Sequence, residues 1–195
     1  MARSEKLSDY KSKRDLKISP EPRAAARRRR SKKLRFVVQK HDATSLHYDF
    51  RLEADGVLKS WAVPKGPSVD PRDKRMAMPT EDHPLDYLDF EGVIPKGNYG
   101  AGPVIVWDIG TYENRTEKDG QEVPVAEAID AGHVSFWLDG SKLRGGFALT
   151  RTGKGDRPRW LLVKKKDEGA DARRNPVSSQ PESALSGRKI EDLGD

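Results

Sequence analysis

The chain has 195 residues, 34% of them hydrophobic and 35% charged, and it contains no cysteine. This length suits one domain with a real core. The absence of cysteine excludes disulfides, thiol nucleophiles, iron–sulfur clusters and cysteine-ligated zinc. No run of about 18 apolar residues occurs, which argues against a transmembrane helix and a membrane partner. The N-terminus lacks an apolar signal segment, so we expect a cytoplasmic location.

Basic residues concentrate at the N-terminus. Residues 1–35 hold 14 Lys and Arg against 4 Asp and Glu, whereas the remaining residues hold 23 against 27. The net charge of +6 therefore comes from a basic arm on a mildly acidic body, and the densest run is RRRRSKK at residues 27–33. Two interpretations are open: a segment that binds a polyanion by releasing its counterions, or a disordered, solubilising tail.

A series of β-strands is predicted directly after the arm. FVVQK, at residues 36–40, is rich in β-branched side chains, and residues 46–53 alternate apolar and polar side chains as in a half-buried strand. Ala54-Asp55-Gly56 is a strong turn signal. We therefore expect residues 57–63 to return as the antiparallel partner of residues 46–53.

The rest of the chain reads as short strands between turns rich in Gly and Pro. Further strands are expected at residues 75–80, 90–94, 103–112, 133–138, 147–152 and 159–165, with one internal helix at residues 125–131. Regularly spaced short strands are typical of a β-barrel or sandwich. From residue 169 the chain is rich in Ser, Pro and charge. We assign a basic N-terminal arm to 1–35, a β-domain to 36–168 and a flexible tail to 169–195.

The alternation in residues 46–53 puts three functional groups on one face of a strand. His47, Asp49 and Arg51 share that face, while the apolar side chains of the run, from Leu46 onward, face the core. An imidazole and a carboxylate two residues apart can bind one metal ion, and a bend over residues 42–45 would add His41 as a third ligand. Arg51 beside a metal suits a phosphate oxygen. On its own, a His-x-Asp pair is more often part of a solvent-exposed polar face than a metal site.

A second polar cluster, EDHPLDY at residues 81–87, contains the third of the four histidines. His83 and Tyr87 have donors that suit a phosphoryl oxygen, and His83 could act as a general acid. A solvated surface loop is the alternative. His133 begins an apolar run and is interpreted as structural. The glycine-rich PKGNYGAG, at residues 95–102, lacks the ending of a P-loop and precedes a strand, so we interpret it as a turn.

Long stretches of the chain resemble one family. FVVQKHDATSLHYDFRLEADGVLKSWAVPKGPS, EDHPLDYLDFEGVIPKGNYGAG and FALTRTGKGDRPRWLLVKKKDE closely resemble the 3′-phosphoesterase module of bacterial DNA ligase D. LSDYKSKRDLKISPEP matches the N-terminal segment of that family, so the resemblance spans residues 8–168. It implies a mainly β fold: a compact eight-stranded barrel with short flanking helices and a hydrophilic active site on its outer surface.

The resemblance also implies an activity. Family members are metal-dependent enzymes, typically with Mn²⁺ although other divalent transition metals are possible. They remove a 3′-terminal ribonucleoside and then the 3′-phosphate, leaving a 3′-OH for ligation in double-strand break repair by end joining. Matching positions imply metal ligands at His41, His47 and Asp49, and phosphate-holding or catalytic groups at Arg51, His83 and Tyr87. Positions associated with substrate handling are Arg14, Asp15, Glu21, Lys65, Arg75 and Glu81.

The expected partners are DNA 3′ ends, which would place the protein at the nucleoid. The family module is often fused to polymerase and ligase domains, and 195 residues cannot hold either. We therefore expect a stand-alone module that works with separate end-joining polymerase, ligase and end-binding proteins. Two other functions stay open. One is a non-haem Fe(II) oxygenase with His47, Asp49 and His133 as ligands and Arg144 grasping an oxo-acid; the other is a non-catalytic nucleic-acid-binding barrel.

Overall fold

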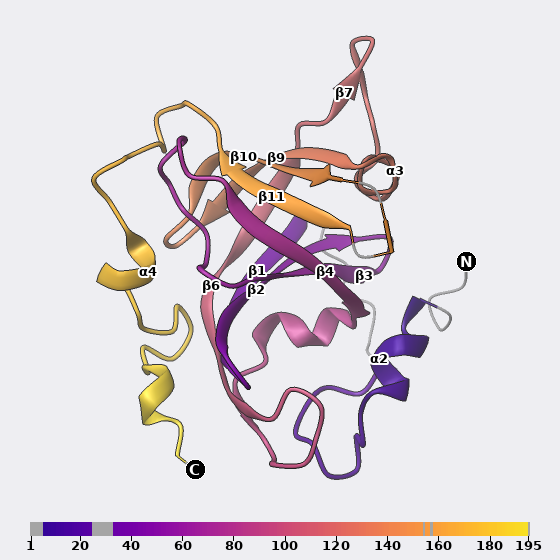
Figure 1. Ribbon diagram of the computed structural model, residues 1–195, viewed down its shortest axis with the longest axis vertical. Helices are drawn as coiled ribbons and strands as arrows, with labels where there is room; N and C mark the ends of the chain where they lie inside the picture. Colours follow the sequence, from indigo (N-terminus) through magenta and orange to yellow (C-terminus); the bar gives the residue numbers. More distant parts are fainter. Residues whose placement is uncertain (1–5, 25–32, 154, 157, 195) are drawn as a thin grey trace.

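A closed antiparallel β-barrel forms the body of the computed structural model, which describes residues 6–24, 33–153, 155–156 and 158–194 (Figure 1). Within this described part, eight strands follow one another around the barrel and the last pairs with the first. In spatial order they are β1 (Leu34–Asp42), β2 (Leu46–Ala54), β3 (Val57–Val63), β4 (Arg75–His83), β11 (Arg159–Lys164), β10 (Arg144–Thr152), β9 (His133–Gly140) and β6 (Gly102–Asn114). The prediction of a mainly β, eight-stranded barrel is confirmed.

Smaller strands and helices lie outside the closed ring of the barrel. Strand β5 (Gly92–Ile94) pairs with β6 outside the closed ring, and β7 (Glu117–Lys118) with β8 (Gln121–Glu122) forms a separate hairpin. The helices are short: α2 (Ser8–Ser12), η1 (Leu85–Asp89), α3 (Val125–Ala131), α4 (Pro176–Ser179) and η2 (Ile190–Asp192). None of the helices in the described ranges is long and apolar enough to cross a membrane.

The hairpin of β1 and β2 sets the register of the polar residues. His41 pairs with His47 and Gln39 pairs with Asp49 across the two strands. Because paired residues in antiparallel strands point to the same face of the sheet, the hairpin collects their side chains together. The bend expected at residues 42–45 is this hairpin turn, and it brings His41 back beside His47.

Two apolar cores lie on opposite faces of these strands. The barrel interior holds alternate residues of β2, among them Tyr48 and Phe50. A second core covers part of the outer face and joins β-strand residues to Leu7, Tyr10 and the apolar residues of η1. Leu46, expected in the core, is instead 46% exposed because it lies beside the hairpin turn.

The segments outside the barrel strands lie against it. Tyr10, fully buried, donates its hydroxyl to the Pro22 carbonyl at 2.5 Å. At the other end, where composition suggested a flexible tail, the chain follows the barrel surface (yellow in Figure 1). The Trp107 indole donates to the Gln180 carbonyl at 2.7 Å, and Ile190 is buried. The division into an arm (1–35), a β-domain (36–168) and a tail (169–195) stays a prediction. The basic run at residues 27–33 lies outside the described residues, except for its last residue.

Candidate active site

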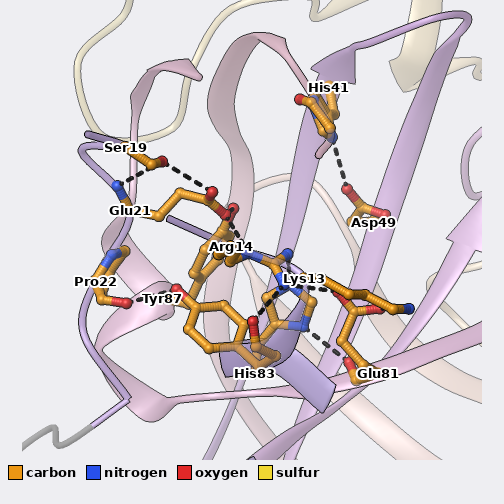
Figure 2. A network of polar contacts seen from close by, with 12 residues as sticks. Lys13, Arg14, Ser19, Glu21, Pro22, His41, Asp49, Glu81, His83 and Tyr87 are labelled. Carbon is orange, nitrogen blue, oxygen red and sulfur yellow. Dashed lines mark hydrogen bonds and ion pairs between the residues drawn. The ribbon is translucent and has the colours of Figure 1, made fainter. Parts of the chain in front are cut away.

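Three ligand-type side chains converge near the turn of the β1–β2 hairpin. Asp49 Oδ2 lies 3.3 Å from His41 Nδ1 and 3.2 Å from His47 Nε2. Their ligand atoms all lie within 4.8 Å of one another, which makes them the one such group of three His or acidic residues found among the described residues. Figure 2 shows His41 and Asp49 directed toward each other.

The hydrogen bonds of the two imidazoles fit a cation between these atoms. His41 Nε2 donates to the Gly100 carbonyl at 2.6 Å, and His47 Nδ1 donates to the Ser45 carbonyl at 3.0 Å. A carbonyl only accepts, so each imidazole's proton lies on the nitrogen facing away from Asp49 when the ring is neutral. Two nitrogen lone pairs and a carboxylate oxygen then face one another. A shared cation would stabilise this arrangement, and a carbonyl that accepts from the outer ring nitrogen is the usual support of a metal-bound histidine.

The charges around Asp49 keep it ionised. Burial alone would raise the pKa of Asp49, but Arg51 and the two imidazoles hold it well below its usual value. Burial would conversely lower the pKa of His47, but its hydrogen bond with Asp49 raises it above the ordinary value. A carboxylate that stays ionised is a ready ligand for a divalent ion.

Arg51 links the ligand cluster to the second polar cluster. Its side chain is 3% exposed, and Nη2 lies 3.5 Å from Asp49 Oδ2. Nε donates to Gln39 Oε1 at 2.8 Å, while the Gln39 amide donates to the carbonyls of Tyr87 and Phe90. Gln39 therefore ties Arg51 to the loop that carries η1. The strand pattern gave no reason to single out this glutamine.

His83 is a neutral imidazole between two guanidinium groups. Nδ1 donates to the Glu81 carbonyl at 2.9 Å, which leaves Nε2 to accept from Arg14 Nη2 at 3.2 Å. Complete burial, with Arg51 and Arg14 close by, lowers its pKa well below the ordinary value. Arg51 Nη1 lies 3.1 Å from Nδ1, so two guanidinium groups flank the imidazole, and their positive charge favours an anion at this position.

A buried ionic network holds the N-terminal segment over this position (Figure 2). Arg14 binds Glu21 at 2.8 Å and Glu81 at 2.9 Å, and all three side chains are 5% exposed or less. The Tyr87 hydroxyl donates to Glu21 Oε2 at 2.8 Å, and its ring lies 4.9 Å from the Arg51 guanidinium carbon. Burial, followed by the charge of Glu21, raises the pKa of Tyr87 well above its ordinary value.

The residues implied by the resemblance divide into two groups. A pocket of about 380 Å³ is lined by eight of the twelve: Arg14, His41, His47, Asp49, Arg51, Glu81, His83 and Tyr87. Glu21 touches this group through Arg14 and Tyr87.

The other three predicted residues lie elsewhere. Lys65 and Arg75 line a separate pocket of about 380 Å³ with Lys74 and Asp73. Asp15 is exposed and accepts the backbone N–H of Lys17.

The residues of the oxygenase interpretation do not come together. His133 is exposed, and its Nδ1 lies 2.9 Å from Thr150 Oγ1. It does not join the group of His47 and Asp49. Arg144 pairs with Asp139 at 3.1 Å, and both side chains are largely exposed. His41 takes the third position that this interpretation gave to His133.

The chain matches the family model of the DNA ligase D 3′-phosphoesterase domain over residues 39–151, more than half of its length. It is 51% identical over 194 residues, 97% of the chain, to the multifunctional non-homologous end joining protein LigD of Pseudomonas aeruginosa. It is 44% identical over 85% of the chain to proteins of Mycolicibacterium smegmatis and Mycobacterium tuberculosis named LigD. The chain spans about a fifth of these relatives, or 22%, 21% and 20% of their lengths. On this evidence the chain belongs to the DNA ligase D 3′-phosphoesterase domain family.

Proposed function

We propose that this protein is a phosphoesterase that repairs DNA 3′ ends. It removes 3′-terminal ribonucleosides as a phosphodiesterase and 3′-phosphates as a phosphomonoesterase, and leaves a 3′-OH that a ligase can join. The observation that carries the proposal is the position of Asp49 Oδ2, within 3.5 Å of His41, His47 and Arg51 in one pocket. Membership of the 3′-phosphoesterase family supports the reaction class.

His41, His47 and Asp49 would hold a divalent metal. Two imidazole nitrogens and one carboxylate oxygen suit Mn²⁺ and other divalent transition metals, and we propose Mn²⁺ for this site. When bound, such an ion supplies Lewis-acid polarisation of a phosphoryl oxygen and lowers the pKa of a bound water. The backbone carbonyls of Gly100 and Ser45 fix the orientation of both imidazoles.

The charges in the pocket favour a phosphate once the metal is present. Among the lining side chains, the carboxylates of Asp49 and Glu81 balance the guanidinium groups of Arg14 and Arg51. A divalent ion would therefore leave two uncompensated positive charges in a largely desolvated place. A phosphate dianion neutralises them, and the donors of Arg51 stabilise negative charge that develops on the phosphoryl oxygens.

His83 and Tyr87 have distinct proposed roles. His83 is neutral in the free protein and has no free N–H, because Nδ1 donates to the Glu81 carbonyl and Nε2 accepts from Arg14. The added negative charge of a bound phosphate raises its pKa, and His83 could then protonate the leaving oxygen. Because its hydroxyl donates to Glu21, Tyr87 supports Arg51 mainly through its ring.

The remaining candidates would position the substrate. Arg14, Glu21 and Glu81 hold the N-terminal segment at the pocket. Lys65 and Arg75, in their separate basic pocket, would contact the phosphate backbone upstream of the reacting end. Asp15 is an exposed residue of the N-terminal segment, and we propose that it also contacts the DNA.

The names of the relatives place them in non-homologous end joining. We propose the same pathway for this chain, with DNA ends at the nucleoid as substrates and an end-joining polymerase, a ligase and end-binding proteins as partners. A non-catalytic nucleic-acid-binding barrel is the competing function. It would leave the group of His41, His47 and Asp49 without a role.

The test is an end-group assay on a primer–template whose primer ends in two ribonucleotides. With Mn²⁺, we expect release of one ribonucleoside, then a transient 3′-phosphate, then a 3′-OH. With EDTA, we expect the primer to stay intact. Binding of the primer–template that survives EDTA, with no processing under either condition, would support the non-catalytic barrel instead.

A further inference from the structure

An exposed aromatic ring stands at the rim of the candidate active site without an assigned role. Tyr99 is 48% exposed, yet it lines the same pocket as His41 and Asp49. It belongs to the glycine-rich residues 95–102, which connect β5 to β6 and which the sequence suggested to be only a turn. Half-exposed aromatic rings beside a nucleic-acid site are common surfaces for base stacking.

The loop holds this ring in a fixed place. Backbone hydrogen bonds join Asn98 N to the Pro95 carbonyl and Ala101 N to the Asn98 carbonyl. The carbonyl of Gly100, directly after Tyr99, accepts from His41. Two residues further, Gly102 packs against the backbone of the β1–β2 hairpin so closely that a Cβ would lie 2.0 Å from the Asp42 carbonyl oxygen. The ring is therefore carried by a segment anchored to a metal ligand.

Cations keep the ring oriented toward the pocket. Lys13 Nζ lies 5.1 Å and the Arg14 guanidinium carbon 5.3 Å from the centre of the Tyr99 ring. Both cations are themselves bound to Glu81. No residue of the described chain hydrogen-bonds the Tyr99 hydroxyl, so the ring rather than the phenol makes the contacts of this side chain. Such cation–ring contacts favour one ring orientation.

The pocket also has an apolar side that a phosphate would not use. Ala43 of the hairpin, Ile94 of β5, and Tyr99 and Gly100 of the β5–β6 connection line it next to the metal-ligand group. Its volume of about 380 Å³ falls in the range of small-molecule sites, roughly 300–1,000 Å³. We therefore expect this side to hold a flat group attached to the phosphate.

The strand order indicates which nucleoside of the substrate would lie beside Tyr99. The metal-ligand residues lie on β1 and β2, the loop with Tyr99 adjoins β6 beside β1, and the basic pocket of Lys65 and Arg75 lies at the ends of β3 and β4. The loop and the basic pocket therefore adjoin opposite sides of the β1–β2 hairpin, which carries the metal-ligand residues. If the upstream backbone lies over the basic pocket, the terminal nucleoside lies on the side of Tyr99.

We propose that Tyr99 stacks against the base of the 3′-terminal nucleoside, the group that leaves in the diesterase step. The inference rests on the proposed function and adds a subsite for the leaving nucleoside. In that step the bond between phosphorus and the 5′ oxygen of the terminal nucleoside breaks. Water supplies hydroxide to phosphorus and a proton to the departing 5′ oxygen. The monoesterase step has no terminal base, so Tyr99 has nothing to stack on and does not contribute.

The test compares three primer–templates that differ only at the 3′ end. The first ends in two ribonucleotides, the second carries a stable abasic ribose in the last position, and the third ends in a 3′-phosphate. For Tyr99→Ala we expect kcat/KM to fall roughly five- to 150-fold on the first, the usual effect of losing one stacked base. We expect no change on the other two. Tyr99→Phe should retain activity, and Leu185→Ala, an exposed residue far along the chain, serves as the surface control.

Two outcomes would overturn the inference. An equal loss on all three ends would mean that Tyr99 acts through His41 or on an upstream base, and no loss on any end would mean that it contacts no substrate. Both are judged against a wild-type protein that processes these ends. A wild-type protein that leaves all three unchanged in Mn²⁺ would refute the proposed function itself.

Discussion

The buried ionic network of Arg14 predicts a large and specific loss of stability. Arg14→Ala would leave the carboxylates of Glu21 and Glu81, 0% and 3% exposed, without their guanidinium partner. Breaking a buried ion pair from one side costs roughly 3–5 kcal/mol. Glu81 keeps Lys13 and Glu21 keeps Ser19, so we expect a value near the lower limit, about 3 kcal/mol. For a chain of this size, that corresponds to a fall in Tm of roughly 6–12 °C.

The assay is urea and thermal unfolding followed by tryptophan fluorescence, together with limited proteolysis of the N-terminal segment. Lys13→Ala is the matched control because Lys13 binds the same carboxylate from a side chain that is 42% exposed. Its effect should stay below about 1 kcal/mol, as for exposed ion pairs. A loss of less than about 1 kcal/mol for Arg14→Ala, with unchanged protease resistance, would refute the reasoning.

Three further predictions concern pH, metal and loop geometry. Burial would raise the pKa of Glu81, but its own backbone amide and a neighbouring guanidinium lower it. This carboxylate therefore stabilises the fold above its unfolded pKa of about 4.3 and loses that contribution as pH falls further. The difference in unfolding free energy between wild type and Glu81→Gln should shrink below that pH, and a constant difference down to pH of about 3 would contradict it. Mn²⁺ at 100 times its Kd should raise the Tm by roughly 5–11 °C, with no rise in His47→Ala. Gly100→Ala should weaken Mn²⁺ binding roughly 10- to 100-fold in a titration, because its Cβ would lie 3.2 Å from the His41 ring. Gly97→Ala is the control and should leave Mn²⁺ binding unchanged, because Gly97 also has a positive φ but has open space around it.

Local sequence patterns predicted the strands well. The alternation in residues 46–53 and the turn at Asp55-Gly56 match β2, β3 and the turn between them. The helix expected at residues 125–131 has those bounds in the structure and ends at Gly132, with φ +92. These elements were predictable because period and turn chemistry are encoded within a few neighbouring residues.

Long-range packing was not predictable in the same way. Asp49 and Arg51 were expected on a solvent-facing strand surface, but they are 6% and 3% exposed because the N-terminal segment and η1 cover that face. Leu7 and Tyr10 sit among charged residues, so no periodic pattern marked them as part of a second core. Likewise, Gln39 gave no local signal, since its role depends on partners at residues 51, 87 and 90.

The most direct test of the proposed metal site measures Mn²⁺ binding and turnover in the same titration. Mn²⁺ is titrated into metal-free protein while ribonucleoside release is followed from a primer–template whose primer ends in two ribonucleotides. We predict that the rate rises from zero and saturates at one ion per chain. His47→Ala should show neither tight Mn²⁺ binding nor turnover, although its far-UV circular dichroism should match that of wild type. Ribonucleoside release that continues at the same rate in EDTA, or that persists in His47→Ala, would contradict the assignment of His41, His47 and Asp49 as the metal site of a 3′-end phosphoesterase.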